Sequence, residues 1–225
     1  MTSKNGGIIM RVRKKPWAEG YINDHSDLIV TAPETQLGHW QERFEKQQPL
    51  QIEIGIGKGR FIVEMARQHP EINFLGIEIQ ESVIATALRQ LVESGLTNVQ
   101  LVETDGANVD TLFAENEVDA LFLNFSDPWP KTRHAKRRLT SPNFLVHYEK
   151  VLKPAGMIQF KTDNRGLFEY SLASFNNYGL TFDEVWLDLH NSAGNEGNVE
   201  TEYEQKFSAK GPIYELKAHF PTLTH

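Results

Sequence analysis

The feature that most constrains the fold is a run of three alternating glycines, Gly55, Gly57 and Gly59. Residues 50–54 before it read as a short apolar strand, and residues 60–68 after it repeat apolar side chains at helical spacing. Glycines in such a turn let backbone amides approach a ligand closely, and the start of a helix favours a negative group. The sequence therefore predicts a strand, a ligand-binding turn and a helix, which together open an α/β fold.

A carboxylate follows the next predicted strand. Residues 73–77 form that strand, and Glu78 ends it, 23 positions after Gly55. A carboxylate at this place accepts hydrogen bonds from the ribose hydroxyls of a bound nucleoside. The dinucleotide pattern GxGxxG requires a sixth-position glycine, which is Arg60 here. The pattern therefore favours S-adenosylmethionine (AdoMet) over NAD.

Two further acids follow predicted strands. Asp105 comes after the strand at residues 98–102, where it either accepts from an adenine amino group or caps a helix. Asp127 follows the apolar strand at residues 118–123, in a loop that Pro128 and Pro130 stiffen. Since the carboxyl ends of parallel strands share one edge of a sheet, we expect these acids and Glu78 to lie together.

The segment after this loop holds the densest positive charge of the chain, within residues 131–138. The formal net charge is −7, so binding of nucleic acid requires positive charge to be concentrated locally, as it is here. In the loop itself, Trp129 either stacks on a base or anchors the core. The segment therefore favours a phosphate-binding surface beside a reacting centre, against the alternative of a solvated turn.

Strands and helices alternate to the end of the chain, where strands at 181–187 and 213–220 are joined by a loop. We predict an α/β fold with a doubly wound, mostly parallel, seven-stranded Rossmann-like sheet and an antiparallel C-terminal hairpin. Residues 1–48 are expected to form an irregular basic N-terminal extension, whose arm carries Arg11, Arg13, Lys14 and Lys15. Residues 49–225 are expected to form a single domain.

Composition excludes several classes of protein. The chain has no cysteine, which excludes disulfides and cysteinyl metal sites, and no apolar run long enough to cross a membrane. The opening residues lack the apolar core of a secretory signal, so a cytoplasmic protein is expected. The histidines show no metal-ligand spacing, and no metal is expected; these are His25, His39, His69 and His147.

Several strings together resemble one family. The chain is similar to class I AdoMet-dependent methyltransferases, and more narrowly to the bacterial tRNA (guanine-N7-)-methyltransferases. The resemblance covers residues 10–220 and rests on residues 53–59 (EIGIGKG), 76–78 (GIE), 124–131 (NFSDPWPK), 133–138 (RHAKRR), 160–165 (FKTDNR) and 201–204 (TEYE). The glycine string is common to many methyltransferases, whereas the 124–131 and 201–204 strings are much narrower.

The resemblance implies a substrate and a set of site residues. The substrate is the guanosine at position 46 of the tRNA variable loop, and the cofactor is AdoMet. Asp127 is the implied catalytic residue. The implied cofactor site is Glu53, Gly55, Gly57, Gly59, Glu78, Asp105 and Asp127. The implied guanosine site is Lys131, Asp163, Thr201, Glu202, Tyr203 and Glu204, and the implied RNA contacts are Arg133, His134, Lys136, Arg137 and Arg138.

Guanine N7 carries a lone pair and no proton, so attack on a methyl group needs no general base. We therefore expect Asp127 to orient the base or balance charge, and Asp163 or Glu202 to accept from the guanine N1–H and amino group. Two alternatives stay open: methylation of an exocyclic amine or a protein side chain, and an RNA-binding module without activity. The sequence favours neither a monomer nor a homodimer.

Overall fold

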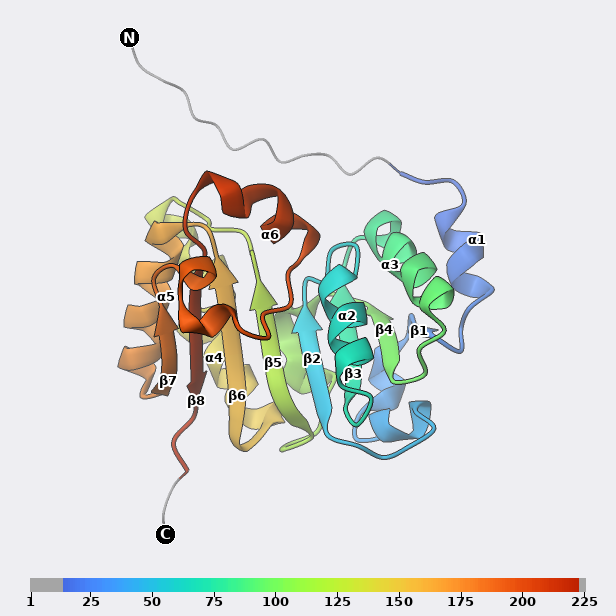
Figure 1. The fold of residues 1–225 in the computed structure, drawn as a ribbon. Helices are drawn as coiled ribbons and strands as arrows, with labels where there is room; N and C mark the ends of the chain where they lie inside the picture. Colours follow the sequence, from blue (N-terminus) through green and yellow to red (C-terminus); the bar gives the residue numbers. More distant parts are fainter. Residues whose placement is uncertain (1–13, 223–225) are drawn as a thin grey trace.

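A computed structural model describes residues 14–222, and these form a single eight-stranded sheet with helices on both faces (Figure 1). The strands are β1 Ile29–Val30, β2 Leu50–Ile54, β3 Asn73–Glu78, β4 Val99–Glu103, β5 Val118–Asn124, β6 Leu152–Thr162, β7 Thr181–Trp186 and β8 Tyr214–His219. The helices are α1 Ala18–Asn23, α2 Arg60–Gln68, α3 Glu81–Ser94, α4 Pro142–Val151, α5 Arg165–Tyr178 and α6 Glu202–Phe207.

The sheet is doubly wound around β2. Its strand order is β1-β4-β3-β2-β5-β6-β8-β7, in which β8 is antiparallel to both β6 and β7 and the other pairs are parallel. The predicted mostly parallel sheet with an antiparallel C-terminal hairpin is therefore confirmed, but it has eight strands and not the predicted seven, because β1 pairs with β4. Residues of β5 are buried except for Asp119, which is half-buried, as a central strand covered on both faces requires.

Two hydrophobic clusters cover the two faces of the sheet. Apolar residues of α4 and α5 pack on one face, where Tyr148 and Phe168 are fully buried. Residues of α1, α2 and α3 pack on the other face around Phe61 and Leu88. In Figure 1, α2 lies in front of the sheet and α4 lies behind it. Each helix therefore packs its apolar side against one face of the sheet.

The N-terminal part differs from the prediction. Residues 14–48 are not irregular, because α1 packs on α3 and β1 adds a two-residue parallel strand beside β4. Trp40 is fully buried, and its indole Nε1 donates to the carbonyl oxygen of Leu112 at 2.7 Å. The apolar residues responsible are too widely spaced for a local periodicity, and only contacts with distant parts of the chain bury them. Residues 1–13, including Arg11 and Arg13 of the predicted arm, lie outside the described residues.

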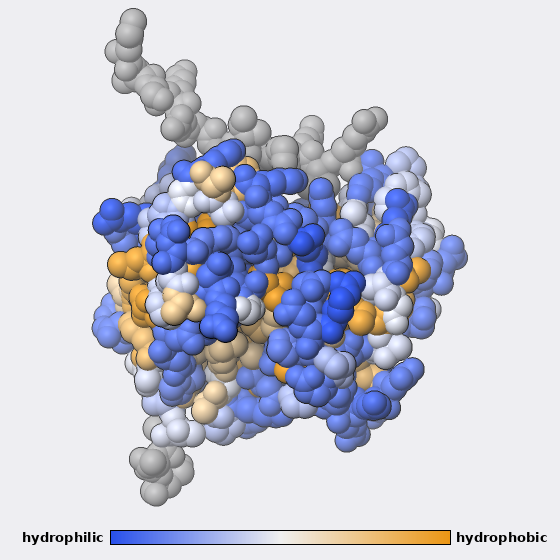
Figure 2. Space-filling model, viewed as in Figure 1, coloured by the Kyte–Doolittle hydropathy of each residue, from blue (hydrophilic) through white to orange (hydrophobic). Residues whose placement is uncertain are grey.

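The surface seen in Figure 2 is mainly hydrophilic, with hydrophobic side chains gathered beside α5 and β7. Val185 and Leu187 are among the exposed apolar residues of that side. Within residues 14–222, none of the helices has the length and apolar content needed to span a bilayer. The carboxyl ends of β2 to β6 point to one common edge of the sheet, which carries the polar residues considered next (Figure 1).

Candidate nucleoside and substrate pockets

The glycine turn after β2 has the conformation that the sequence predicts. Gly55, Gly57 and Gly59 have φ angles of +79°, +56° and +87°, a region that other residues enter only with strain. Gly59 has a second constraint, since a Cβ atom there would lie 2.8 Å from the Cβ of Ala87. The backbone N–H of Gly57 donates to Oε2 of Glu78 at 3.2 Å, which joins the turn to the end of β3.

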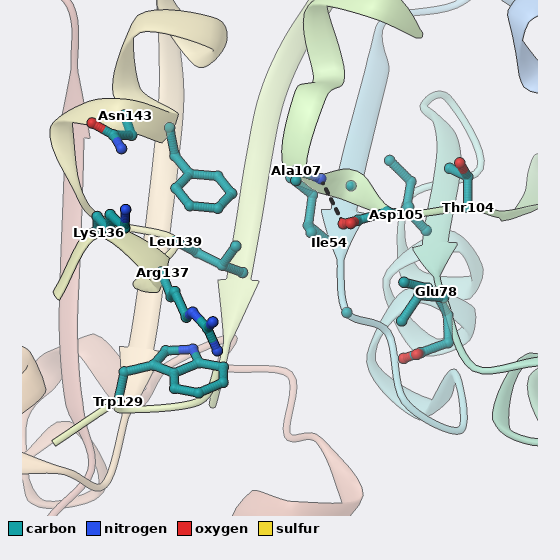
Figure 3. A pocket seen from close by; sticks show the side chains of 15 residues that line it. Ile54, Glu78, Thr104, Asp105, Ala107, Trp129, Lys136, Arg137, Leu139 and Asn143 are labelled. Atoms are coloured by element: carbon teal, nitrogen blue, oxygen red, sulfur yellow. Dashed lines mark hydrogen bonds between the residues drawn. The ribbon is translucent and has the colours of Figure 1, made fainter. Parts of the chain in front are cut away.

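The larger pocket at this edge has a volume of about 550 Å³. It is lined by Ile54, Gly55, Ile77, Glu78, Ile79, Thr104, Asp105, Gly106, Ala107, Trp129, Lys136, Arg137, Leu139, Asn143 and Phe144. Figure 3 shows Glu78 and Asp105 on one side of the space, and Trp129 with Arg137 on the other. The ends of β2, β3 and β4 thus bring two of the predicted acids together with the first glycine. Apolar side chains and two carboxylates suit a flat, uncharged ring with hydroxyl and amino donors.

Each of these two acids is held by backbone donors. Glu78 accepts from the N–H groups of Gly57 and Gln80, and its half-burial raises the pKa of its carboxyl group. Asp105 accepts from the N–H of Ala107 at 3.0 Å, which caps the 3-10 helix Gly106–Thr111. Asp105 therefore caps the helix, as one of the two readings expects, and it also lines the pocket, where its contact with an adenine amino group stays a prediction.

Glu53 lies deeper than the other acids. Its side chain is 1% exposed, and its Oε1 accepts from the side-chain amide of Asn124 at 2.9 Å. Oε2 of Glu53 and Oδ1 of Asn124 are both buried and have no hydrogen-bond partner among the described residues. Burial raises the pKa of Glu53 to about 8, against the lowering effects of the Asn124 hydrogen bond and the Lys161 charge. An orphaned buried carboxyl oxygen of this kind requires an explanation, and a ligand donor supplies one.

The loop after β5 separates the larger pocket from a second one. The second pocket has a volume of about 280 Å³ and is lined by Phe125, Ser126, Asp127, Pro128, Thr162, Asp163, Asn164 and Tyr203. Trp129, two residues after Asp127, lines the larger pocket instead. Phe125 and Trp129 have φ angles of +52° and +40°, a strained region for such bulky residues. Two strained residues on either side of Asp127 indicate a loop shaped for function.

The predicted cofactor residues are thus divided between different places. Gly55, Glu78 and Asp105 line the larger pocket, while Asp127 lines the second pocket. Glu53 lines neither of the two pockets. The single cluster of acids expected from the sequence is therefore a row that extends across both pockets and into the interior.

The predicted guanosine residues are divided as well. Asp163 and Tyr203 line the second pocket, and the hydroxyl of Tyr203 donates to Oδ2 of Asp163 at 3.0 Å. Thr201 caps α6 by accepting from the N–H of Glu204 at 3.0 Å. Glu202 accepts from Gln90 at 3.5 Å, and Lys131 is exposed at the start of the basic segment.

Glu204 has a position that the resemblance does not imply. Its carboxylate is fully buried and accepts from Lys161 at 2.7 Å, from Asn198 at 3.0 Å and from His190 at 2.9 Å. Burial raises the pKa of Glu204, but the charge of Lys161 and these hydrogen bonds outweigh it and lower the pKa. Because both oxygens are paired inside the protein, Glu204 holds α6 in place.

Lys161, the partner of Glu204, is the residue that the sequence-based site missed. Its side chain is fully buried, and its Nζ also donates to Asn198 and to the carbonyl of Val199. One signal is present in the sequence, because Lys161 ends a mainly apolar predicted strand. A lysine buried there requires an acidic partner. No spacing rule identifies that partner, which lies 43 residues further along the chain.

The basic segment contains two kinds of residue. Arg133, Lys136 and Arg137 are exposed, and the guanidinium of Arg137 lies 4.9 Å from the ring centre of Trp129. Arg138 is half-buried and donates to the carbonyl oxygens of Pro128 and Trp129, both at 3.0 Å. Together with Lys131, four exposed cations are therefore available to a polyanion, whereas Arg138 holds the strained loop in place.

Comparison with known proteins shows which family the chain resembles. The family model described as "Putative methyltransferase" matches residues 47–216. The tRNA (guanine-N(7)-)-methyltransferase of Levilactobacillus brevis is 65% identical over 95% of this chain and 99% of its own length. The corresponding protein of Lactiplantibacillus plantarum is 62% identical over 94% of this chain and 99% of its own length.

Solved structures show the same fold at much lower identity. An antibiotic-related methyltransferase superposes with a TM-score of 0.62 and 18% identity, over 86% of this chain and 98% of that one. The 16S rRNA methyltransferase KamB superposes with a TM-score of 0.60 and 15% identity, over 81% and 93% of the two chains. At this identity the similarity concerns the fold alone.

Proposed function

Since this chain belongs to the bacterial tRNA (guanine-N7-)-methyltransferase family, we propose that it transfers a methyl group from AdoMet to guanine N7 in tRNA. The proposed target is the guanosine at position 46 of the variable loop. The observation that carries the proposal is the pair of pockets on either side of the 125–130 loop. The larger pocket suits a nucleoside. The second pocket has two carboxylates, Asp127 after β5 and Asp163 after the neighbouring strand β6.

The residues of the larger pocket fit AdoMet. Glu78 and Asp105 line the pocket, and we assign Glu78 to the ribose hydroxyls and Asp105 to the adenine amino group. Glu53 does not line this pocket, but its buried Oε2 has no donor among the described residues, so we assign it to the ammonium group of AdoMet. When bound, AdoMet supplies an electrophilic methyl group on a positively charged sulfur.

The glycine turn lets the backbone approach the proposed cofactor closely. Gly55 lines the pocket, and its positive φ angle turns the chain without a side chain that would fill the space. Gly57 and Gly59 support the turn through the bond to Glu78 and the tight contact with Ala87. We assign these two glycines to the shape of the cofactor pocket and not to its lining.

The chemistry requires alignment more than proton transfer. Guanine N7 has an in-plane lone pair and no hydrogen, so Asp127 has no proton to remove before the methyl group moves. As the transfer proceeds, positive charge leaves the sulfur and appears on the purine. A carboxylate in the second pocket stabilises that charge, and this is the role that we assign to Asp127.

Asp163 is the residue that we propose recognises guanine. Its carboxylate is exposed in the second pocket, and a carboxylate accepts from the N1–H and amino donors of guanine. Adenine lacks the N1–H and the 2-amino group, so it loses these hydrogen bonds and is disfavoured. Glu202 lies on α6 beside Tyr203, and it remains a candidate for the second of the two donors.

Cations of the 131–137 segment are proposed to bind tRNA phosphates. Lys131, Arg133, Lys136 and Arg137 are exposed, while the chain as a whole carries a formal net charge of −7. An acidic body with one basic surface directs a polyanion to that surface and disfavours other orientations. A tRNA substrate also implies that the protein acts in the cytoplasm.

The test is incubation of the purified protein with labelled AdoMet and unmodified bulk tRNA, followed by nucleoside analysis of the digested RNA. Label in 7-methylguanosine is the expected result. Label in a nucleoside methylated on an exocyclic amine contradicts the proposed target atom. Binding of AdoMet without transfer to any tRNA contradicts the proposed activity.

A further inference from the structure

Tyr203 and Asp163 are 40 residues apart in the chain and meet across the second pocket. The phenolic hydroxyl donates to Oδ2 of Asp163 at 3.0 Å, and both residues line the pocket together with Asp127. Among the described residues that line this pocket, Tyr203 is the one that α6 contributes. The contact therefore joins α6 to the end of β6 at the place where a target base has to enter.

The ring of Tyr203 is fixed by its neighbours. It stacks on Phe207 with ring centres 4.3 Å apart and planes at 22°, and its centre lies 5.1 Å from that of Phe125. The next residue, Glu204, is bound to the buried Lys161. Packing of the ring and this ion pair together determine where the hydroxyl lies, so the donor is in place before any substrate arrives.

The Tyr203 hydroxyl binds one oxygen of the Asp163 carboxylate and leaves the other oxygen exposed. Asp163 is exposed, and across residues 14–222 no second group donates to its carboxylate. Partial burial of the phenol, whose residue is 41% exposed, together with the hydrogen bond to Asp163, raises the pKa of Tyr203 to about 12. Tyr203 therefore keeps its proton near neutral pH and acts as a donor. One carboxylate oxygen is held, and the other is left to accept.

We propose that Tyr203 is a positioning residue that orients the carboxylate of Asp163 so that its second oxygen accepts a hydrogen bond from the Watson–Crick edge of the target guanine. This inference rests on the function proposed above. In this proposal Tyr203 does not contact the reacting atoms. Its effect is to reduce the conformational freedom that Asp163 loses when guanosine binds.

The test compares Tyr203→Phe with the wild-type chain, with Asp163→Asn and with the double variant. Single-turnover methyl transfer to unmodified tRNA is measured with labelled AdoMet, since slow variants remain measurable with enzyme in excess. Affinity for tRNA is measured in the presence of S-adenosylhomocysteine. Tyr178→Phe is the matched control, because its hydroxyl donates to a carboxylate, that of Glu149, at 2.7 Å and lines neither pocket.

We expect Tyr203→Phe to lower kcat/KM for tRNA about tenfold, the scale of one hydrogen bond to a charged group. The AdoMet affinity and the melting temperature of Tyr203→Phe should stay at wild-type values. Tyr178→Phe should match the wild-type chain in all of these measurements. In the Asp163→Asn background, Tyr203→Phe adds less than about twofold, because the carboxylate that it orients is gone.

Three results overturn the inference: wild-type activity in Tyr203→Phe, effects of the two substitutions that multiply independently, or a loss of AdoMet affinity or thermal stability in Tyr203→Phe. The last of these indicates a structural role alone. The proposed function fails separately, if the wild-type chain itself forms no 7-methylguanosine.

Discussion

The side-chain amide of Asn124 donates a 2.9 Å hydrogen bond to the carboxyl group of Glu53, from β5 to its neighbour β2 at the centre of the sheet. The bond lies directly below the loop that separates the two pockets, since β5 leads into that loop. It joins the strand that opens the glycine turn to the strand that delivers Asp127. One buried contact therefore links the strands that lead to the proposed cofactor site and to the proposed base site.

The first prediction concerns the pH dependence of stability. Burial raises the pKa of Glu53 from 4.5 to about 8, so the folded protein holds a proton that the unfolded chain releases above pH 4.5. Stability without ligand therefore falls as pH rises from about 4.5 to 8 and levels off above that. Glu53→Gln keeps the acceptor oxygen for Asn124 and carries no charge, so it removes this part of the pH dependence.

Urea unfolding at pH 6 and pH 9 measures the effect. Between pH 6 and pH 9 the wild-type chain should lose about 1–3 kcal/mol of stability relative to Glu53→Gln, the scale of a buried polar group left uncompensated. The control is Glu196→Gln, which changes the same charge at an exposed position. Equal pH dependence in both variants would show that Glu53 is ionised in the free protein.

The second prediction concerns the buried ion pair of Lys161 and Glu204. Lys161→Met leaves the Glu204 carboxylate buried without its cation, which should lower the free energy of unfolding by about 3–5 kcal/mol. Lys153→Met is the matched control, since the ion pair of Lys153 with Asp119 is partly exposed and should cost less than about 1 kcal/mol. Similar losses in the two variants, measured by urea unfolding, would contradict the role given to Lys161.

The third prediction separates the two pockets. Asp127→Asn should lower the rate of methyl transfer about 10²-fold, the scale of one electrostatic group at a reacting centre, and leave AdoMet affinity unchanged. Asp105→Asn should weaken AdoMet binding and change the transfer rate at saturating AdoMet little, because Asp105 lines the larger pocket. Calorimetry and single-turnover rates distinguish the two. Weaker AdoMet binding in Asp127→Asn would place that residue in the cofactor site.

The fourth prediction separates two arginines of the basic segment. Arg133→Ala removes an exposed cation and should reduce the dependence of tRNA affinity on salt by about 0.7–0.9 in log–log slope. Arg138→Ala removes the donors that hold the carbonyls of Pro128 and Trp129. It should leave that slope unchanged and slow methyl transfer. A reduced slope for Arg138→Ala alone would mean that this guanidinium binds phosphate.

The sequence predicts the parts of this molecule that local patterns determine. The glycine turn, Glu78 at the end of β3 and Asp105 after β4 lie where their spacing places them, because parallel strands share one edge. The C-terminal hairpin follows from two strands joined by a loop. These features need only the alternation of strands and helices, which the chain displays clearly.

Contacts between distant residues account for what the sequence does not predict. The burial of Trp40 depends on Leu112, and the order of residues 14–48 depends on α3 and β4. The division of the acids between two pockets depends on the backbone of Phe125 and Trp129, which is left-handed although neither residue is glycine. Arg138 reads as one more cation of a basic run until its two carbonyl partners are known.

The most direct measurement of the central claim uses two tRNA transcripts that differ in one atom of the target base. One carries guanosine at position 46 of the variable loop, and the other carries 7-deazaguanosine, which keeps the Watson–Crick edge and replaces N7 by C–H. The account predicts similar affinity for both transcripts, and methyl transfer from labelled AdoMet to the guanosine transcript alone. Equal labelling of the two would contradict it, because the methyl group would then go to another atom.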